Sequence, residues 1–322
     1  MARKTDKAPV NLRRPNKKWL NFTTLYIVLF AILTITYLAE AFLPKPSKVV
    51  LAHYHLSHTG YYELIIPLVI ILVVIWLISL YGSVKVKNYA RLIKESKDGQ
   101  GMDLIADGLL VQTISLPVVS NISYFLNHIA GNHPRLQPTM TIIVNYVSLG
   151  LMALALAYIF VGSTKVCNLV PGRVRQLPHS LWQAVFITAS SLYAYFIIIE
   201  PIHHPLDRRV YFLPDWLLVV TIAVPYMFFW YLGIRGAYNL FLYRRNTKGS
   251  VYRSSLSYLA AGIAVVVLAS IITRIITSLA TRITTLQITP VLLIVYGFIT
   301  IVGIGYILIA IGAKKLKDIE EA

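Results

Sequence analysis

A polar stripe runs through one of the most apolar segments of the chain. In the stretch SIITRIITSLATR, residues 270–282, Ser270, Arg274, Ser278 and Arg282 are spaced by four and would share one face of a helix. A charge at membrane depth costs about 2.5–3.5 kcal/mol even on lenient scales, so this face is expected to meet protein or water instead of lipid. A guanidinium binds carboxylate or phosphate through two parallel hydrogen bonds. The stripe therefore predicts a cavity for an anionic or zwitterionic ligand.

A second polar stripe lies about 150 residues earlier, at Ser120, Tyr124 and His128, and is expected to line the same cavity. The acids expected to balance the arginines are Glu200 and Glu40, which end two other apolar segments. Arg274 also lies about two turns from the end of its segment. Snorkelling of its side chain to the membrane surface is therefore the alternative interpretation.

Histidines gather in two segments that are expected to lie on one side of a membrane. Zn, Cu or Ni would accept such imidazoles together with carboxylates. However, neither an HExxH motif nor a pair of cysteines accompanies them, so they can equally be uncharged side chains at the membrane surface. No cofactor is predicted, and haem or a transition metal is the alternative. The histidines concerned are His53, His55 and His58 in HYHLSH, and His203 and His204 in IHHP.

The composition is that of a membrane protein. The 322 residues are 57% hydrophobic and only 13% charged, whereas globular domains are about one quarter charged. The formal charge of +17 does not indicate nucleic-acid binding, because the cations lie in short segments between apolar runs. The chain contains no recognisable phosphate-binding loop, nucleophile elbow or kinase motif, so no catalytic residue is predicted.

Eight segments are long and apolar enough to cross a bilayer, which predicts an all-α integral membrane protein. The third is the weakest, since it contains Asp107, Pro117 and several amides, and an interfacial or broken helix is its alternative. The predicted spans are 21–43, 61–82, 104–130, 138–162, 180–200, 212–234, 256–281 and 288–312.

The distribution of Lys and Arg predicts the orientation. With eight spans, the loops on the side of the termini contain 23 of these residues and the opposite loops contain 6. Cations concentrate in cytoplasmic loops, so both termini are expected in the cytoplasm, with the protein in a plasma or inner membrane. The first apolar segment is too long for a signal peptide and is expected to remain as a helix.

An internal repeat is predicted from a shift of 150 positions. Residues 61–165 then align with 211–315 without a gap and with 18 identities. Four spans in each unit predict two parallel-repeat four-helix bundles. The expected parts are a basic tail (1–20), the first repeat (21–165), a cytoplasmic linker (166–179), the second repeat (180–315) and a C-terminal tail (316–322).

The long inner loop at 83–103 has an amphipathic pattern. Val86 and Ala90 alternate with Lys87 and Arg91, and Gly99 resembles a helix stop. A helix on the inner membrane surface is expected here, with its cations toward anionic lipid headgroups. The alternative is ordinary anchoring by positive charge. The oligomeric state is not predicted.

Two classes of function are compatible with these patterns. Parallel repeats and a polar stripe favour a transporter for a small anionic or zwitterionic solute or lipid component. The outer histidines favour a redox or metal-handling subunit, and a non-catalytic assembly subunit is the third alternative. In topology alone the pattern is similar to haem A synthase, which would imply haem ligated by paired histidines. Here His133 has Ile283 as its repeat partner, so the paired motif is not present.

Overall fold

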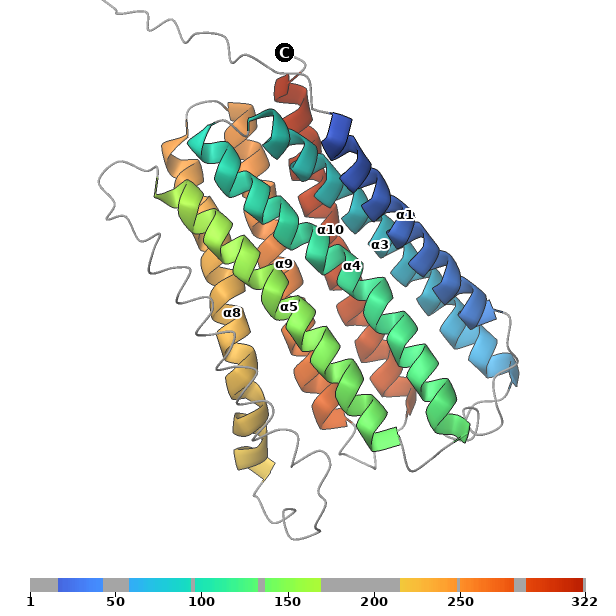
Figure 1. Ribbon diagram of the computed structural model, residues 1–322. Coiled ribbons are helices and arrows are strands. Elements are labelled where there is room, and N and C mark those ends of the chain that lie inside the picture. The colour runs from blue at the N-terminus through green and yellow to red at the C-terminus, as the bar shows by residue number, and fades with distance from the viewer. Residues whose placement is uncertain are drawn as a thin grey trace, which may run out of the picture.

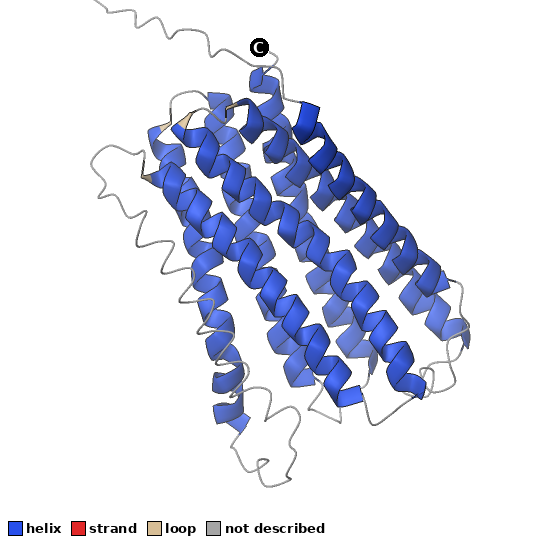
Figure 2. Ribbon diagram, in the orientation of Figure 1, coloured by secondary structure: helices blue, strands red, loops and turns tan. Residues whose placement is uncertain are grey.

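The computed structural model describes residues 17–42, 58–93, 96–132, 137–168, 215–247, 250–280 and 288–320. Within these ranges the chain is all-helical and contains no strand (Figure 2). Seven helices occupy them: α1 (Lys17–Phe42), α3 (His58–Leu92), α4 (Lys97–Asn132), α5 (Gln137–Cys167), α8 (Asp215–Asn246), α9 (Ser250–Ala280) and α10 (Ile288–Glu320).

Five of these helices contain a stretch long and apolar enough to cross a membrane, found in the described part of the chain. The stretches lie in α3, α4, α5, α9 and α10, and α1 adds a shorter apolar one at Thr24–Ala39. Several such helices in one chain are the mark of a multi-pass membrane protein. Each predicted span except 180–200 coincides with a helix, and 180–200 lies outside the described residues. The weak third span is part of the continuous helix α4.

The helices stand side by side (Figure 1). Their directions alternate along the chain, except that α5 and α8 run toward the same end of the bundle. The start of α1 and the end of α10 lie at the same end of the bundle, together with the turn between α3 and α4. We call this end the terminal end. Helix α5 finishes at the terminal end, whereas α8 starts at the opposite end. The chain between them, which lies outside the described residues, therefore connects opposite ends of the bundle.

Six helices contact one another in a closed order. Neighbours in this order are α3, α4, α5, α8, α9 and α10, and α10 in turn contacts α3. The contacts of α4 with α5 and of α9 with α10 are the most extensive. Helix α1 packs outside this ring on α4 and α3, with the rings of Tyr37 and Trp76 5.0 Å apart.

Small residues permit the closest of these contacts. A Cβ added at Gly108 of α4 would lie 2.7 Å from the carbonyl oxygen of Ala155 in α5. A Cβ added at Gly262 of α9 would lie 2.6 Å from the carbonyl oxygen of Gly305 in α10. No side chain fits at such distances, so glycine lets these backbones approach, as is common in membrane helices.

The structure corrects the expected surface helix at 83–103. Helix α3 continues to Leu92, and α4 starts at Lys97 after a short turn. The Ser96 hydroxyl accepts a hydrogen bond from the backbone N–H of Gly99 at 2.9 Å, so Ser96 is the N-cap of α4. Gly99 is thus in the first turn of a helix and does not stop one. Val86 and Ala90 are completely buried and pack in the bundle core.

Candidate functional site

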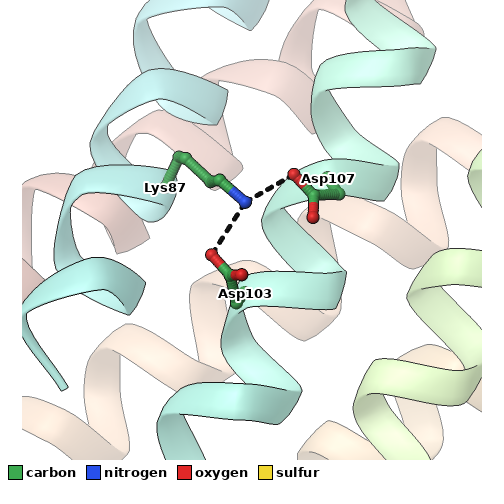
Figure 3. A network of polar contacts seen from close by, with 3 residues as sticks. All are labelled: Lys87, Asp103 and Asp107. Atoms are coloured by element: carbon green, nitrogen blue, oxygen red, sulfur yellow. Dashed lines mark hydrogen bonds and ion pairs between the residues drawn. The ribbon is translucent and has the colours of Figure 1, made fainter. Parts of the chain in front are cut away.

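A buried lysine with two carboxylates lies between α3 and α4 (Figure 3). Lys87 Nζ is 2.5 Å from Asp107 Oδ1 and 2.7 Å from Asp103 Oδ1. The Lys87 side chain is only 7% exposed, while Asp103 and Asp107 are 21% and 34% exposed. With one ammonium and two carboxylates ionised, the cluster has a net charge of −1. We refer to these three residues as the Lys87 cluster.

The geometry of the Lys87 cluster follows from helix periodicity. Asp103 and Asp107 are four residues apart, so both project from one face of α4 toward α3. Asp103 Oδ1 is buried and makes no hydrogen bond within the described residues, so its close approach to the ammonium compensates its burial. A buried charge without a partner is costly, which means that the three side chains depend on one another.

Hydroxyl groups continue the polar face of α3 away from the cluster. Ser83 and Ser79 lie one and two turns before Lys87, and both approach Thr113 of α4. The Thr113 hydroxyl is 2.6 Å from that of Ser79 and 2.9 Å from that of Ser83. The buried phenol of Tyr306, which comes from α10, lies near Ser79. A ladder of buried polar groups thus leads from near Lys87 to the contact between α3 and α10.

A second polar group at the terminal end joins helices that are not neighbours in the ring. The Tyr243 hydroxyl of α8 donates a hydrogen bond of 2.6 Å to Asp98 Oδ2 of α4. The ring of Tyr252 in α9 lies 6.2 Å from that of Tyr89 in α3 and 6.4 Å from that of Tyr243. Tyr243 lies beyond the predicted span 212–234, and burial raises the pKa of its phenol above the ordinary value, so it stays a neutral donor. We refer to these four residues as the tyrosine junction.

Two further contacts connect helices that are distant in the sequence. A Cβ added at Gly82 of α3 would lie 3.3 Å from Ile309 Cγ2 of α10, and one at Gly236 of α8 would lie 3.1 Å from Ile159 Cγ2 of α5. Asn239 of α8 donates a hydrogen bond of 3.1 Å to the Thr164 hydroxyl of α5. In both contacts, of α3 with α10 and of α8 with α5, a glycine of one helix therefore faces an isoleucine side chain of the other.

Most of the residues predicted to line a cavity cannot be placed. Ser120 is half-buried on α4, beside Asn121, which donates a 2.9 Å hydrogen bond to the backbone oxygen of Leu33 in α1. The other candidates form two groups. In the first, the backbone lies in a described helix but the side chain is not described; in the second, the whole residue lies outside the described part. The first group is Glu40, Tyr124, His128, Arg274, Ser278 and, from the histidine set, His58; the second is Glu200, Arg282, His53, His55, His203 and His204.

The described residues contain no group of three or more His, Cys, Asp or Glu side chains that could hold a metal. Four of the predicted histidines lie outside those residues, and the side chain of the fifth, His58, is also not described, so the histidine site remains a prediction. Cys167 is buried at the end of α5.

Sequence reasoning missed the Lys87 cluster for a specific reason. The sequence pattern places Lys87 on a helix at the membrane surface with its charge toward lipid headgroups, whereas in the structure it is buried against two carboxylates. The available signal was the spacing of Ser79, Ser83 and Lys87 by four, which continues one helix face.

Comparison with known proteins gives no relative for this chain. No family model, no curated protein sequence and no solved structure matches it. A function can therefore be proposed only from the geometry described above.

Proposed function

We propose that the chain is an internally duplicated membrane transporter for a small anionic or zwitterionic solute or lipid component. The observation that carries the proposal is the recurrence of the same contacts in two sets of three helices. Gly108 meets Ala155 and Ile159, and Gly262 meets Gly305 and Ile309, through the same backbone and side-chain atoms. In this proposal α3, α4 and α5 correspond to α8, α9 and α10.

The glycine contacts favour an alignment of the two proposed halves that is not a single shift of 150 residues. Helices α5 and α10 correspond by the expected shift of 150, as in Ile159 with Ile309. The first two helices of each half correspond by a shift of 154, which pairs Gly82 with Gly236 and Gly108 with Gly262. The same shift also pairs identical residues elsewhere in these helices, among them Trp76 with Trp230, Tyr89 with Tyr243, Arg91 with Arg245 and Ala106 with Ala260. The difference of four residues is about one helical turn.

The directions of the helices support a parallel repeat. Helices α3 and α8 run toward the terminal end, and α4 and α9 both run away from it (Figure 1). The two halves would then be related by a rotation about an axis along the helices, as in transporters with parallel repeats. The proposed halves are 21–165 and 180–315, joined by the linker 166–179, with the tails 1–20 and 316–322 in the cytoplasm.

The tyrosine junction lies where this relation predicts a contact between the halves. Under the shift of 154, Tyr89 corresponds to Tyr243 and Asp98 corresponds to Tyr252. The hydrogen bond of Tyr243 with Asp98 and the ring contact of Tyr89 with Tyr252 are therefore equivalent contacts that cross between the halves. Rocking of one half against the other would open and close this junction.

The Lys87 cluster distinguishes the halves. Its equivalents under the same shift are Phe241, Ser257 and Ala261, which have no charge. Ionisable residues inside membrane bundles commonly belong to ion or substrate pathways. In our proposal the first half provides the charged network near the terminal end, and the polar stripe around Arg274 provides the solute site at the opposite end.

Uptake by proteoliposomes tests the proposed function. The purified protein is reconstituted, and uptake of radiolabelled glutamate, succinate and phosphate is measured with and without a pH gradient. We expect uptake of at least one of these anions above that of empty liposomes. Uptake of none of them, together with a haem absorbance band in the purified protein, would instead favour the redox class.

The role of Arg274 is tested in the same assay. Arg274→Leu is expected to fold but to lose uptake, and Arg274→Lys to recover only part of it, because an ammonium lacks the bidentate fork. Full uptake by a folded Arg274→Leu variant would mean that this side chain only snorkels, and would refute the assignment of the solute site.

A further inference from the structure

Exposed apolar side chains form stripes along two neighbouring helices. On each helix the members are three or four residues apart, so each stripe is one continuous face. The stripe on α3 comprises Ile70, Val74, Leu77 and Tyr81, and the stripe on α10 comprises Ile301, Ile304, Ile307 and Ile311; each member is between 38% and 51% exposed. In a multi-pass membrane protein such faces contact the hydrocarbon of the bilayer.

The stripes end where cations lie over aromatic rings. On α3, Lys85 Nζ is 5.6 Å from the centre of the Tyr81 ring, one turn beyond the last exposed apolar residue. On α10, Lys315 Nζ is 4.6 Å from the ring of Tyr258, which comes from α9. The boundary between apolar and charged surface therefore falls within one turn on both helices.

Helix α8 contains two more pairs of the same kind. Arg235 Cζ is 5.3 Å from the Tyr238 ring, and Arg244 Cζ is 5.0 Å from the Phe241 ring. Both rings are more than 40% exposed. The cations of all four pairs lie in the last three turns of α3, α8 or α10, which finish at the same end of the bundle. We call Lys85, Arg235, Arg244 and Lys315 the cation belt.

The charges of the cation belt are not neutralised within the described residues. Among these residues, Lys87 is the only cation that pairs with carboxylates, and its partners lie between α3 and α4. Lys315 donates a hydrogen bond to the Ser254 hydroxyl, which adds no negative charge. Each cation instead rests on the face of an aromatic ring, an interaction that orients it without neutralising it.

We propose that the cation belt binds the phosphate groups of anionic phospholipids in the leaflet at the terminal end. Aromatic side chains prefer the boundary between hydrocarbon and headgroups, and long basic side chains there reach outward to the phosphates. Each cation near an anionic surface adds to the electrostatic attraction. Because the ring contacts restrict each side chain in advance, less conformational freedom is lost when a lipid binds. This proposal does not depend on transport.

The test uses the full chain in detergent with added lipid. The thermal midpoint of unfolding is measured with phosphatidylglycerol and with phosphatidylcholine, and bound lipids are counted by native mass spectrometry. We expect a larger rise with phosphatidylglycerol and its preferential retention. Equal effects of the two lipids on the native protein would refute the proposal.

Three variants locate the effect. Replacement of all four belt cations by Gln keeps the rings and is expected to abolish the preference for phosphatidylglycerol. The exchange of Lys for Arg and of Arg for Lys at the same positions should retain it. Lys314→Gln removes an exposed cation one residue from the belt and is the matched control.

Single substitutions provide the test if the fourfold variant does not fold. The single variants Lys85→Gln and Arg235→Gln are then measured, and each should lose part of the preference. Preference unchanged in a folded fourfold variant, or in both single variants, would refute the belt as the binding surface. Single belt variants that lose no more of the preference than Lys314→Gln would also refute it, because the effect would then follow net charge alone.

Discussion

Replacing Lys87 by methionine should strongly destabilise the protein. Methionine keeps the length of the side chain but removes its charge, so Asp103 and Asp107 would remain between α3 and α4 without a cation. Removing one partner of a buried ion pair costs about 3–5 kcal/mol. The two carboxylates are 21% and 34% exposed, so water compensates part of the loss and the lower end, about 3 kcal/mol, is expected.

The assay is thermal unfolding in detergent, followed by intrinsic fluorescence. A change of 1 kcal/mol shifts the midpoint of a large domain by about 2 °C or slightly more, so a fall of roughly 6 °C is expected for Lys87→Met. Lys85→Met is the matched control, because it removes a cation two residues away that lies over an exposed ring. An exposed cation–ring contact contributes only about 0.5–1 kcal/mol, so the control should change the midpoint by roughly 1–2 °C.

A triple variant separates the ion network from simple loss of packing. Lys87→Met combined with Asp103→Asn and Asp107→Asn removes all three charges together, and such replacement of a buried network is often neutral. The triple variant should therefore be more stable than Lys87→Met alone. The reasoning fails if Lys87→Met unfolds within about 1 °C of the native protein, or if the triple variant is no more stable than the single one.

The remaining predictions concern the tyrosine junction, the helix contacts and the orientation. Because burial raises the pKa of Tyr243 in the folded state, its contribution to stability is complete below the unfolded value near 10 and is lost as the pH rises above it; Tyr243→Phe should show a smaller alkaline loss of stability in a pH series of melting curves. Gly108→Leu and Gly262→Leu should each prevent the close helix contact and reduce the yield of folded protein on size-exclusion chromatography, whereas leucine at Gly297, where an added Cβ meets nothing within 4 Å, should be tolerated. A cysteine at Ser96 should react with an impermeant thiol reagent only from the cytoplasm, and one at Ser57 only from outside, in a Cys167→Ser background; labelling of both from one side would contradict the predicted orientation.

The positions of most helices could be predicted from the sequence, because bilayer thickness sets the length of an apolar segment. Every described helix coincides with a predicted span, including α4 with its internal Pro117. The sequence did not reveal how far the helices continue beyond the apolar part. Residues 83–92 remain helical because Val86 and Ala90 pack in the core, and this burial depends on partner helices that a local pattern does not identify.

The Lys87 cluster was unpredictable for a related reason. The hydrophobic pattern marked Asp107 as an anomaly in an apolar span and Lys87 as one of many basic loop residues. Only the antiparallel packing of α3 on α4 brings the two together at 2.5 Å. The register of the proposed repeat is ambiguous in the sequence in the same way, since shifts of 150 and 154 both align apolar residues with apolar residues. Contacts between Gly82 and α10, and between Gly236 and α5, favour the shift of 154 for the first two helices of each proposed half.

Cross-linking across and within the halves tests the proposed transport mechanism most directly. Asp98 and Tyr243 are replaced by cysteine to link the halves. In a separate variant Ser79 and Thr113, whose hydroxyls are 2.6 Å apart, are replaced to link two helices of one half. Cross-link formation is measured on gels, and uptake of radiolabelled glutamate, succinate and phosphate is measured in proteoliposomes. The account predicts that the link between halves abolishes uptake, that a reductant restores it, and that the link within one half leaves uptake unchanged. Full uptake with the halves linked would contradict it.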